Sequence, residues 1–298
     1  MSAHGMTERT LNVPDLQRRQ LFNRGMEVIA WLAALIAIAI LVVVVYSVGR
    51  RGWTELNFNL LTKAPIPFSF TNAPQGLSNA FAGTLVIVAI ATAMALPVGI
   101  LVAIYLNEFA PPAIRNGVGM ALDVLAGVPA IVIGIFVYGL LVAGGGGQSG
   151  LKGSFALGIL MLPFVARTTI EVLALVPNSL REASLGLGVA QWRTTLSIVL
   201  PRAIGGILTG TVLAVARVAG ETAPLLFTSS LVGAKTSWNP LHALQTVPVA
   251  IFELSESPDP KDHARAWAAA FVLLLFILFA SLTARWLATR SARKIAGR

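Results

Sequence analysis

The sequence predicts an all-α integral membrane protein with six transmembrane helices, and three observations support this fold class. Apolar residues make up 56% of the 298 residues, and charged residues make up only 12%. Soluble globular domains contain about 25% charged residues, so an ordinary soluble enzyme, a disordered chain and a nucleic-acid-binding arm are excluded. The third observation is a series of long apolar stretches, each close to the length that crosses a hydrocarbon core of about 30 Å.

The spans follow from these stretches in chain order. The first, residues 26–48, contains the uninterrupted apolar run Val28–Val45. A polar segment precedes it and no cleavage site follows, so we interpret it as a retained span and not a signal peptide. The other spans are predicted at residues 80–106, 118–143, 154–175, 203–227 and 266–288. The intervening segments include an N-terminal tail (1–25), an external loop (49–79), a cytoplasmic loop (176–202) and a C-terminal tail (289–298).

The positions of the basic residues predict that both termini face the cytoplasm. Six spans place the termini on one side, and that choice puts twelve Lys and Arg residues in the inside segments against seven outside. An excess of Lys and Arg on the cytoplasmic side is typical of multi-pass proteins. The net charge of +9 is therefore explained by topology and by contacts with anionic lipid, without a nucleic-acid partner.

Two of the predicted spans carry charged residues, which a bilayer core tolerates beside a partner or a polar cavity. Arg167 and Glu171 lie in the fourth span, and Arg217 and Glu221 lie in the fifth. Residues four apart share a helix face, so each pair is predicted to meet, either as a fastener between helices or along a substrate path. Guanidinium groups match the oxygens of a tetrahedral oxyanion, and we predict a path lined by these four residues and Thr222.

Other motifs in the chain do not indicate chemistry. The absence of Cys excludes disulfides and thiolate catalysis, and the three His residues are too scattered for a metal site. The glycine-rich stretch that begins at Gly144 lacks the Gly-Lys-Ser/Thr order of a phosphate-binding P-loop. Asp123 is predicted to make a helix-start or interhelical contact. We expect no catalytic residue, no metal and no cofactor bound by this chain.

The loop at 176–202 predicts a helix–turn–helix elbow. Glu182–Leu187 can form a short helix, Gly188 permits a sharp turn, and a second helix begins near Gln191. Pro201 is predicted to mark the boundary before the next span. An elbow of this kind suits docking into a groove on a cytosolic partner.

The same loop resembles the EAA motif of ABC importer permeases, E-A-A-x3-G-x9-I-x-L-P. The motif positions are occupied by Glu182, Ala183, Ser184, Gly188, Ile198, Leu200 and Pro201, with Ser in place of the second Ala as the only departure. The resemblance implies the type I ABC importer (MetI-like) permease fold. It also implies that the elbow, including Trp192, is the coupling helix that contacts an ATP-binding subunit.

Further segments are similar to the permeases of phosphate-specific (Pst) transporters. They are Asp123–Pro129, Leu162–Glu171 and Arg217–Leu225, and the stretch Leu244–Phe252 resembles the external loop of the A-type subunit. This resemblance makes 80–288 the transport domain and implies the inner (cytoplasmic) cell membrane and inorganic phosphate as substrate. The implied partners are a second, C-type permease, two copies of a cytosolic ATPase that uses ATP and Mg, and an external phosphate-binding protein.

Three alternatives remain open at this point. A permease of the same fold could carry another oxyanion, such as sulfate or molybdate, because a fold does not by itself select a substrate. An ion-coupled secondary transporter would be expected to have inverted repeats with broken helices in both halves, and the N-terminal half has no counterpart to Gly220–Pro224. A membrane scaffold without transport activity is disfavoured by the charged residues within the spans.

Overall fold

The computed structural model describes residues 14–65, 75–230, 233 and 235–295, and every regular element in these ranges is helical. The chain divides into two compact units, Met1–Val48 and Gly49–Arg298. The described part of the first unit belongs to α1 (Pro14–Gly52), which contains the first predicted span. The second unit contains all other elements.

Five helical segments in the described residues are long and apolar enough to cross a membrane, and a bent pair of helices supplies a sixth span if it is counted as one. The five contain α1, α3 (Ser78–Ile104), α6 (Gly150–Ala174), α9 (Leu200–Ala219) and α12 (Pro260–Ile295). The predicted class of all-α membrane protein is confirmed.

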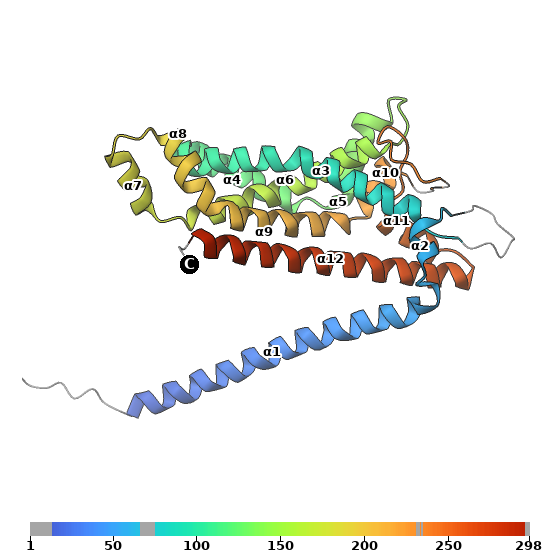
Figure 1. Ribbon diagram of the computed structural model, residues 1–298, viewed down its shortest axis with the longest axis horizontal. Coiled ribbons are helices and arrows are strands. Elements are labelled where there is room, and N and C mark those ends of the chain that lie inside the picture. The colour runs from blue at the N-terminus through green and yellow to red at the C-terminus, as the bar shows by residue number, and fades with distance from the viewer. Residues whose placement is uncertain (1–13, 66–74, 231–232, 234, 296–298) are drawn as a thin grey trace, which may run out of the picture. The chain divides into compact units, whose positions relative to one another are not determined.

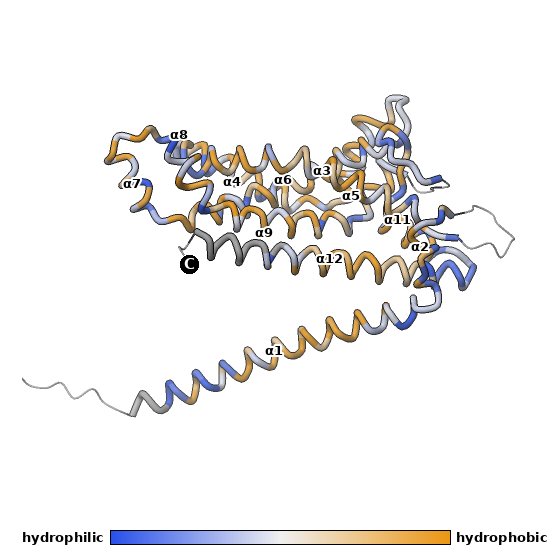
Figure 2. Tube along the Cα trace, viewed as in Figure 1, coloured by the Kyte–Doolittle hydropathy of each residue, from blue (hydrophilic) through white to orange (hydrophobic). Residues whose placement is uncertain are grey.

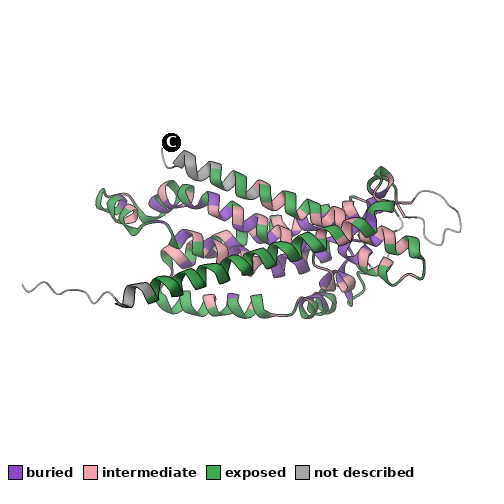
Figure 3. Ribbon diagram, turned by 90° about the horizontal axis from the view of Figure 1, so that it is seen from below, coloured by how far each residue is buried: buried purple, intermediate pink, exposed green. Residues whose placement is uncertain are grey.

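In the second unit, α3, α6, α9 and α12 run alongside one another (Figure 1). Leu157, Met161 and Val165 of α6 are fully buried and form one apolar cluster with Ile87 of α3 and Val218 of α9. Apolar residues follow the lengths of these helices, and hydrophilic residues gather toward the ends of the unit (Figure 2). Buried residues lie between the packed helices (Figure 3). The helices therefore share one apolar core centred on α6.

The third predicted span is not a continuous helix. It consists of α4 (Pro112–Gly127) and α5 (Ala130–Val137), and the helical path bends by 95° between them. Val128 is extended, with φ −66° and ψ 129°, because the residue before a proline is disfavoured in the helical region. Pro129 in turn has no N–H with which to continue the ladder of α4. A π turn, η3 (Tyr138–Val142), completes the span.

The fifth predicted span, 203–227, is also interrupted, and the break falls at Gly220–Thr222, before Pro224. Helix α9 ends at Ala219, and a short helix, α10 (Ala223–Thr228), follows. Pro224 accounts for the break, because its ring would clash with the carbonyl of Gly220 in a continuous helix. The two broken spans cross at Gly134 of α5, where a Cβ atom would lie 2.5 Å from the Cα of Pro224. A glycine is therefore required at this crossing.

The segment between α10 and α12 is held against α3 by buried polar contacts. The side chain of Asn79 donates to the side-chain oxygen of Gln245 at 2.9 Å, and the N–H of Val247 donates to the hydroxyl of Thr84 at 2.8 Å. Val247 begins α11 (Val247–Ser255). Burial raises the pKa of Glu253 in α11 above its ordinary value, and a hydrogen bond from Gln245 acts in the opposite direction. Two further short helices follow α1: η1 (Trp53–Glu55) and α2 (Phe58–Thr62).

The terminal helices extend into both predicted tails. Helix α1 begins at Pro14, so the described part of the N-terminal tail is helical, and α12 continues through residue 289 to Ile295. Residues 1–13 and 296–298, which belong to the predicted tails, lie outside the described residues.

Candidate functional site

The predicted elbow is present, and its turn depends on glycine. Helix α7 (Asn178–Gly186) is followed by Gly188, whose φ of +77° lies in the left-handed region that glycine adopts without strain. Helix α8 (Gln191–Thr194) then begins where the second helix was predicted. These observations confirm the local structure that the sequence predicts for the loop.

The predicted boundary at Pro201 is wrong. Helix α8 continues through a π turn, η4 (Thr195–Val199), directly into α9, and the three form one apolar segment, Gln191–Ala219. Pro201 directly follows this π turn, and its missing N–H removes one hydrogen bond from the continuous segment without ending it. The second arm of the elbow is therefore continuous with a membrane span.

Residues of the EAA-like motif that are far apart in the sequence line one cleft. Ala183 and Ser184 of α7 meet Ile198 and Pro201 across a hollow of about 590 Å³ on the concave side of the elbow. The hydroxyls of Ser184 and Thr194 are 2.8 Å apart, and both residues are buried. The one departure from the motif, Ser in place of Ala, thus supplies a hydrogen bond that joins the two arms.

The surface of the elbow exposes apolar side chains, one of which, Leu187, also lines the cleft. Leu187 is 84% exposed, Trp192 is 56% exposed and Leu185 is 48% exposed. Glu182 is also exposed, whereas Leu200 at the end of the motif is partly buried. Exposed apolar groups that cluster beside polar ones are typical of a surface that binds another protein.

The predicted pairing of Arg167 with Glu171 is wrong. One guanidinium nitrogen of Arg167 forms an ion pair with Asp123 of α4 and donates a hydrogen bond to the carbonyl of Gly119. Glu171 is exposed and forms no ion pair within the described part of the chain. The approach of α4 to α6 supplies a partner that helix periodicity cannot reveal, and the predicted interhelical role of Asp123 is confirmed.

Arg167 also opens onto a polar cleft. The cleft has a volume of about 530 Å³, lies between α4 and α6, and is lined by Arg115, Asn116, Asp123 and Arg167 among other residues. The Nε atom of Arg167 is buried and has no hydrogen-bond partner. Two guanidinium groups against one carboxylate leave this cleft with a surplus of positive charge, which suits an anion.

The predicted contact between Arg217 and Glu221 on one helix face is also wrong. Helix α9 ends at Ala219, so Glu221 and Thr222 fall in the non-helical break and are partly exposed. The guanidinium carbon of Arg217 instead lies 4.4 Å from the centre of the Phe164 ring of α6. Phe164 precedes Arg167 by three residues, about one helical turn, so the fold brings both arginines to neighbouring levels of α6.

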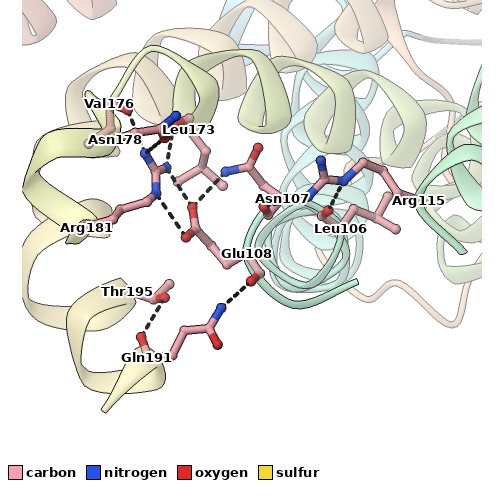
Figure 4. A network of polar contacts seen from close by, with 10 residues as sticks. All are labelled: Leu106, Asn107, Glu108, Arg115, Leu173, Val176, Asn178, Arg181, Gln191 and Thr195. Carbon is pink, nitrogen blue, oxygen red and sulfur yellow. Dashed lines mark hydrogen bonds and ion pairs between the residues drawn. The ribbon is translucent and has the colours of Figure 1, made fainter. Parts of the chain in front are cut away.

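Sequence reasoning did not identify a further polar network at the end of α3 (Figure 4). Its centre is Glu108, in the π turn η2 (Tyr105–Phe109), whose side chain accepts hydrogen bonds from Arg181 of α7. One signal was available: Glu108 is the charge that ends the long uncharged stretch after Lys63. The identity of its partner, 73 residues away, could not be read from that position.

An apolar helix bundle with arginines in its spans, broken helices and an exposed elbow defines a membrane-embedded component of a transport system. The chain belongs to the family of binding-protein-dependent transport system inner membrane components, whose model matches residues 95–293. This result confirms the importer permease fold that the elbow motif implied.

Similar proteins indicate which kind of transport system within this family the chain resembles. The chain is 38% identical over 269 residues to the phosphate transport system permease protein PstA of Haemophilus influenzae, covering 90% of this chain and 94% of the relative. It is 36% identical over 291 residues to PstA 1 of Mycobacterium tuberculosis, covering 94% and 92%. A chain of a bacterial alginate ABC transporter shares the fold, with a TM-score of 0.61, 15% identity, and coverage of 93% and 97%.

Proposed function

We propose that this chain is the membrane-spanning permease subunit of an ATP-driven ABC importer that moves inorganic phosphate into the cytoplasm. The similarity to phosphate permeases over nine-tenths of the chain carries this proposal. The two arginines at neighbouring levels of α6 support it, because guanidinium groups bind tetrahedral oxyanions through paired donors. The chain itself is a transport subunit without catalytic residues, and ATP and Mg are used by a separate subunit.

The substrate path that we propose runs past Arg217 and then Arg167. Phe164 positions the guanidinium of Arg217 by a cation–π contact that leaves its N–H donors free for an anion. Arg167, already neutralised in part by Asp123, lines the polar cleft and offers a second and weaker station. Glu171, Glu221 and Thr222 belong to the same path, and the two carboxylates weaken anion binding enough to permit release.

The exposed charges also support a second permease subunit. Arg217 and Glu171 are exposed on this chain although both lie on membrane spans. A charged side chain that faces lipid is costly, by about 2.5–3.5 kcal/mol or more at the centre of a span, so these two side chains require a polar cover. A homologous C-type permease would supply it and would close the path between the two subunits. The remaining proposed partners are two copies of a cytosolic ABC ATPase and an external phosphate-binding protein.

The elbow is the proposed contact with the ATPase. Glu182, Leu187 and Trp192 offer the polar and apolar groups of such a contact. The buried hydrogen bond between Ser184 and Thr194 joins the two arms. Movement of the ATPase would then reach α9 directly, because α8, η4 and α9 are continuous.

The first test concerns the orientation of the chain in the cytoplasmic membrane. We expect Lys235→Cys and Arg193→Cys to be labelled from opposite sides, because the proposed topology places Arg193 in the cytoplasm and Lys235 outside. The natural chain has no Cys, so it serves as an unlabelled background. An impermeant thiol reagent added to intact cells should label only the variant at position 235. Labelling of both variants from outside would contradict the topology.

The second test concerns the substrate. The whole complex in proteoliposomes is expected to accumulate radiolabelled phosphate only when its ATPase subunits are supplied with ATP and its binding protein is present. Unlabelled phosphate should compete, and equal concentrations of sulfate or molybdate should not. Equal competition by sulfate would indicate a permease for another oxyanion, and uptake driven by an ion gradient without ATP would contradict the ABC mechanism.

A further inference from the structure

The end of helix α3 is tied to both arms of the elbow through one residue, Glu108. Its carboxylate accepts two hydrogen bonds from the guanidinium of Arg181 in α7, at 2.7 and 3.1 Å. Its main-chain carbonyl accepts a hydrogen bond from the side chain of Gln191, the first residue of α8. Figure 4 shows these side chains converging on Glu108 from the two helices of the elbow.

The contact with Arg181 is shielded from solvent. The side chain of Glu108 is 5% exposed and that of Arg181 is 16% exposed. A two-pronged pair of this kind is stronger and more directional than an exposed ion pair, and removal of either partner leaves a buried charge uncompensated. The pair therefore holds α7 at a defined distance and angle from the end of α3.

Arg181 also fixes the end of α6. It donates to the carbonyls of Leu173 at 3.0 Å and Val176 at 2.6 Å. The carbonyl of Leu173 also accepts the N–H of Val176, whereas Val176 lies just beyond the end of α6, where carbonyls have no partner within the helix. The carboxylate of Glu108 is fixed from a third direction as well, because the amide of Asn107 donates at 2.7 Å to the same oxygen that accepts the shorter bond from Arg181.

Helix α3 is also held at its other end. Asn79 and Thr84, near its first residue, make the buried contacts with Gln245 and Val247 described above. Between these ends, α3 is one helix from Ser78 to Ile104 that packs along α6. A displacement applied at Glu108 would therefore reach the opposite end of the second unit along one continuous helical segment, Ser78–Phe109, which contains Pro97 in its interior.

We propose that Glu108 is a positioning residue that transmits movement of the elbow to α3, so that α3 moves with the coupling helix during the transport cycle. This inference rests on the proposed function, since it assigns the residue through which an ATP-driven movement enters the membrane. Glu108 contacts neither the ATPase nor the substrate path in this scheme, and it acts through Arg181 and Gln191.

The first experiment measures how much phosphate is imported per ATP hydrolysed by the whole complex in proteoliposomes. Glu108→Gln and Arg181→Gln should each retain ATP hydrolysis and lower the phosphate-to-ATP ratio by about tenfold or more. The double variant should be no worse than either single variant, because the two residues act as one contact. Glu256→Gln, an exposed carboxylate on the opposite side of the proposed membrane, is the matched control and should keep the wild-type ratio.

Two outcomes would overturn the inference in this experiment. A wild-type ratio in Glu108→Gln would show that the contact does not transmit movement. Additive losses in the double variant would show that the two residues act separately. Subunit levels in the membrane, measured by blot, separate either outcome from a failure to assemble.

The second experiment does not depend on the substrate, so it distinguishes failure of this inference from failure of the proposed function. Spin labels at Leu101→Cys on α3 and Ser179→Cys on α7 of the elbow, both exposed positions, report the distance between the two elements in the assembled complex. The distance should stay constant through ATP binding and hydrolysis in the otherwise wild-type chain and change in Glu108→Gln. A change in the otherwise wild-type chain would overturn the inference, even if the Glu108 variant does not assemble or the imported solute is not phosphate.

Discussion

Replacement of Arg217 by glutamine is expected to abolish phosphate uptake by the assembled complex. The substitution removes the only charge that α9 presents at the Phe164 ring, and the glutamine amide offers a single pair of neutral donors to a charged oxyanion. Arg217→Lys keeps the charge but loses the planar fork, so uptake should persist at a strongly reduced rate. The measurement is radiolabelled phosphate uptake in proteoliposomes, normalised to the amount of assembled complex.

The control for this prediction is Arg285→Gln. Arg285 is an exposed arginine of α12 that lines neither the proposed path nor the elbow, so its loss should leave uptake close to wild type. Wild-type uptake by Arg217→Gln at equal assembly would mean that Arg217 only fastens α9 to α6. Lower uptake by Arg217→Gln than by Arg217→Lys would show the contribution of charge. Lower uptake by Arg217→Lys than by the wild type would show the contribution of the guanidinium group.

The second large effect is expected at the turn of the elbow. Gly188→Val should lower phosphate imported per ATP severely while the complex still inserts and hydrolyses ATP. A left-handed backbone costs a residue with a Cβ about 1–2 kcal/mol, and the branched Cβ of valine adds to this cost. The space around Gly188 is open, so the expected defect comes from the backbone angle and not from a collision within this chain.

Two variants make this prediction specific. Gly188→Asn should keep most of the coupling, because asparagine enters the left-handed region more readily than other residues with a Cβ. Gly186→Ala, two residues earlier and equally open, should be close to wild type because its position is helical. An equal loss in all three variants would show that the elbow tolerates no added side chain at its surface, whatever the backbone angle.

The local features of the elbow could be predicted because each depends on a few neighbouring residues. Helix propensity sets α7, and the need for a left-handed residue places glycine at 188. The Ser at position 184 was visible only as a departure from the motif. Its use became clear when the fold placed it beside Thr194, ten residues further along the chain.

The charged residues within the spans were identified correctly, but their partners were not. Helix periodicity pairs Arg167 with Glu171 and Arg217 with Glu221, because only the residue's own helix is considered. In the structure, α4 brings Asp123 to Arg167, and the break after α9 removes Glu221 from the helix face. An arginine in a low-dielectric region pairs with the acceptor that helix packing places closest to it. For Arg167 that acceptor is Asp123, which belongs to another helix.

The sequence by itself determined the class of protein, the places of the apolar spans and the form of the elbow. These depend on the length of apolar runs, on the prolines and on the backbone freedom of Gly188, all of which act over one or two helical turns. Only the tertiary structure decided that α5 and α10 cross at Gly134 and that Glu108 receives both arms of the elbow. The physical reason is that such contacts join residues tens of positions apart, and their partners are set by how whole helices pack.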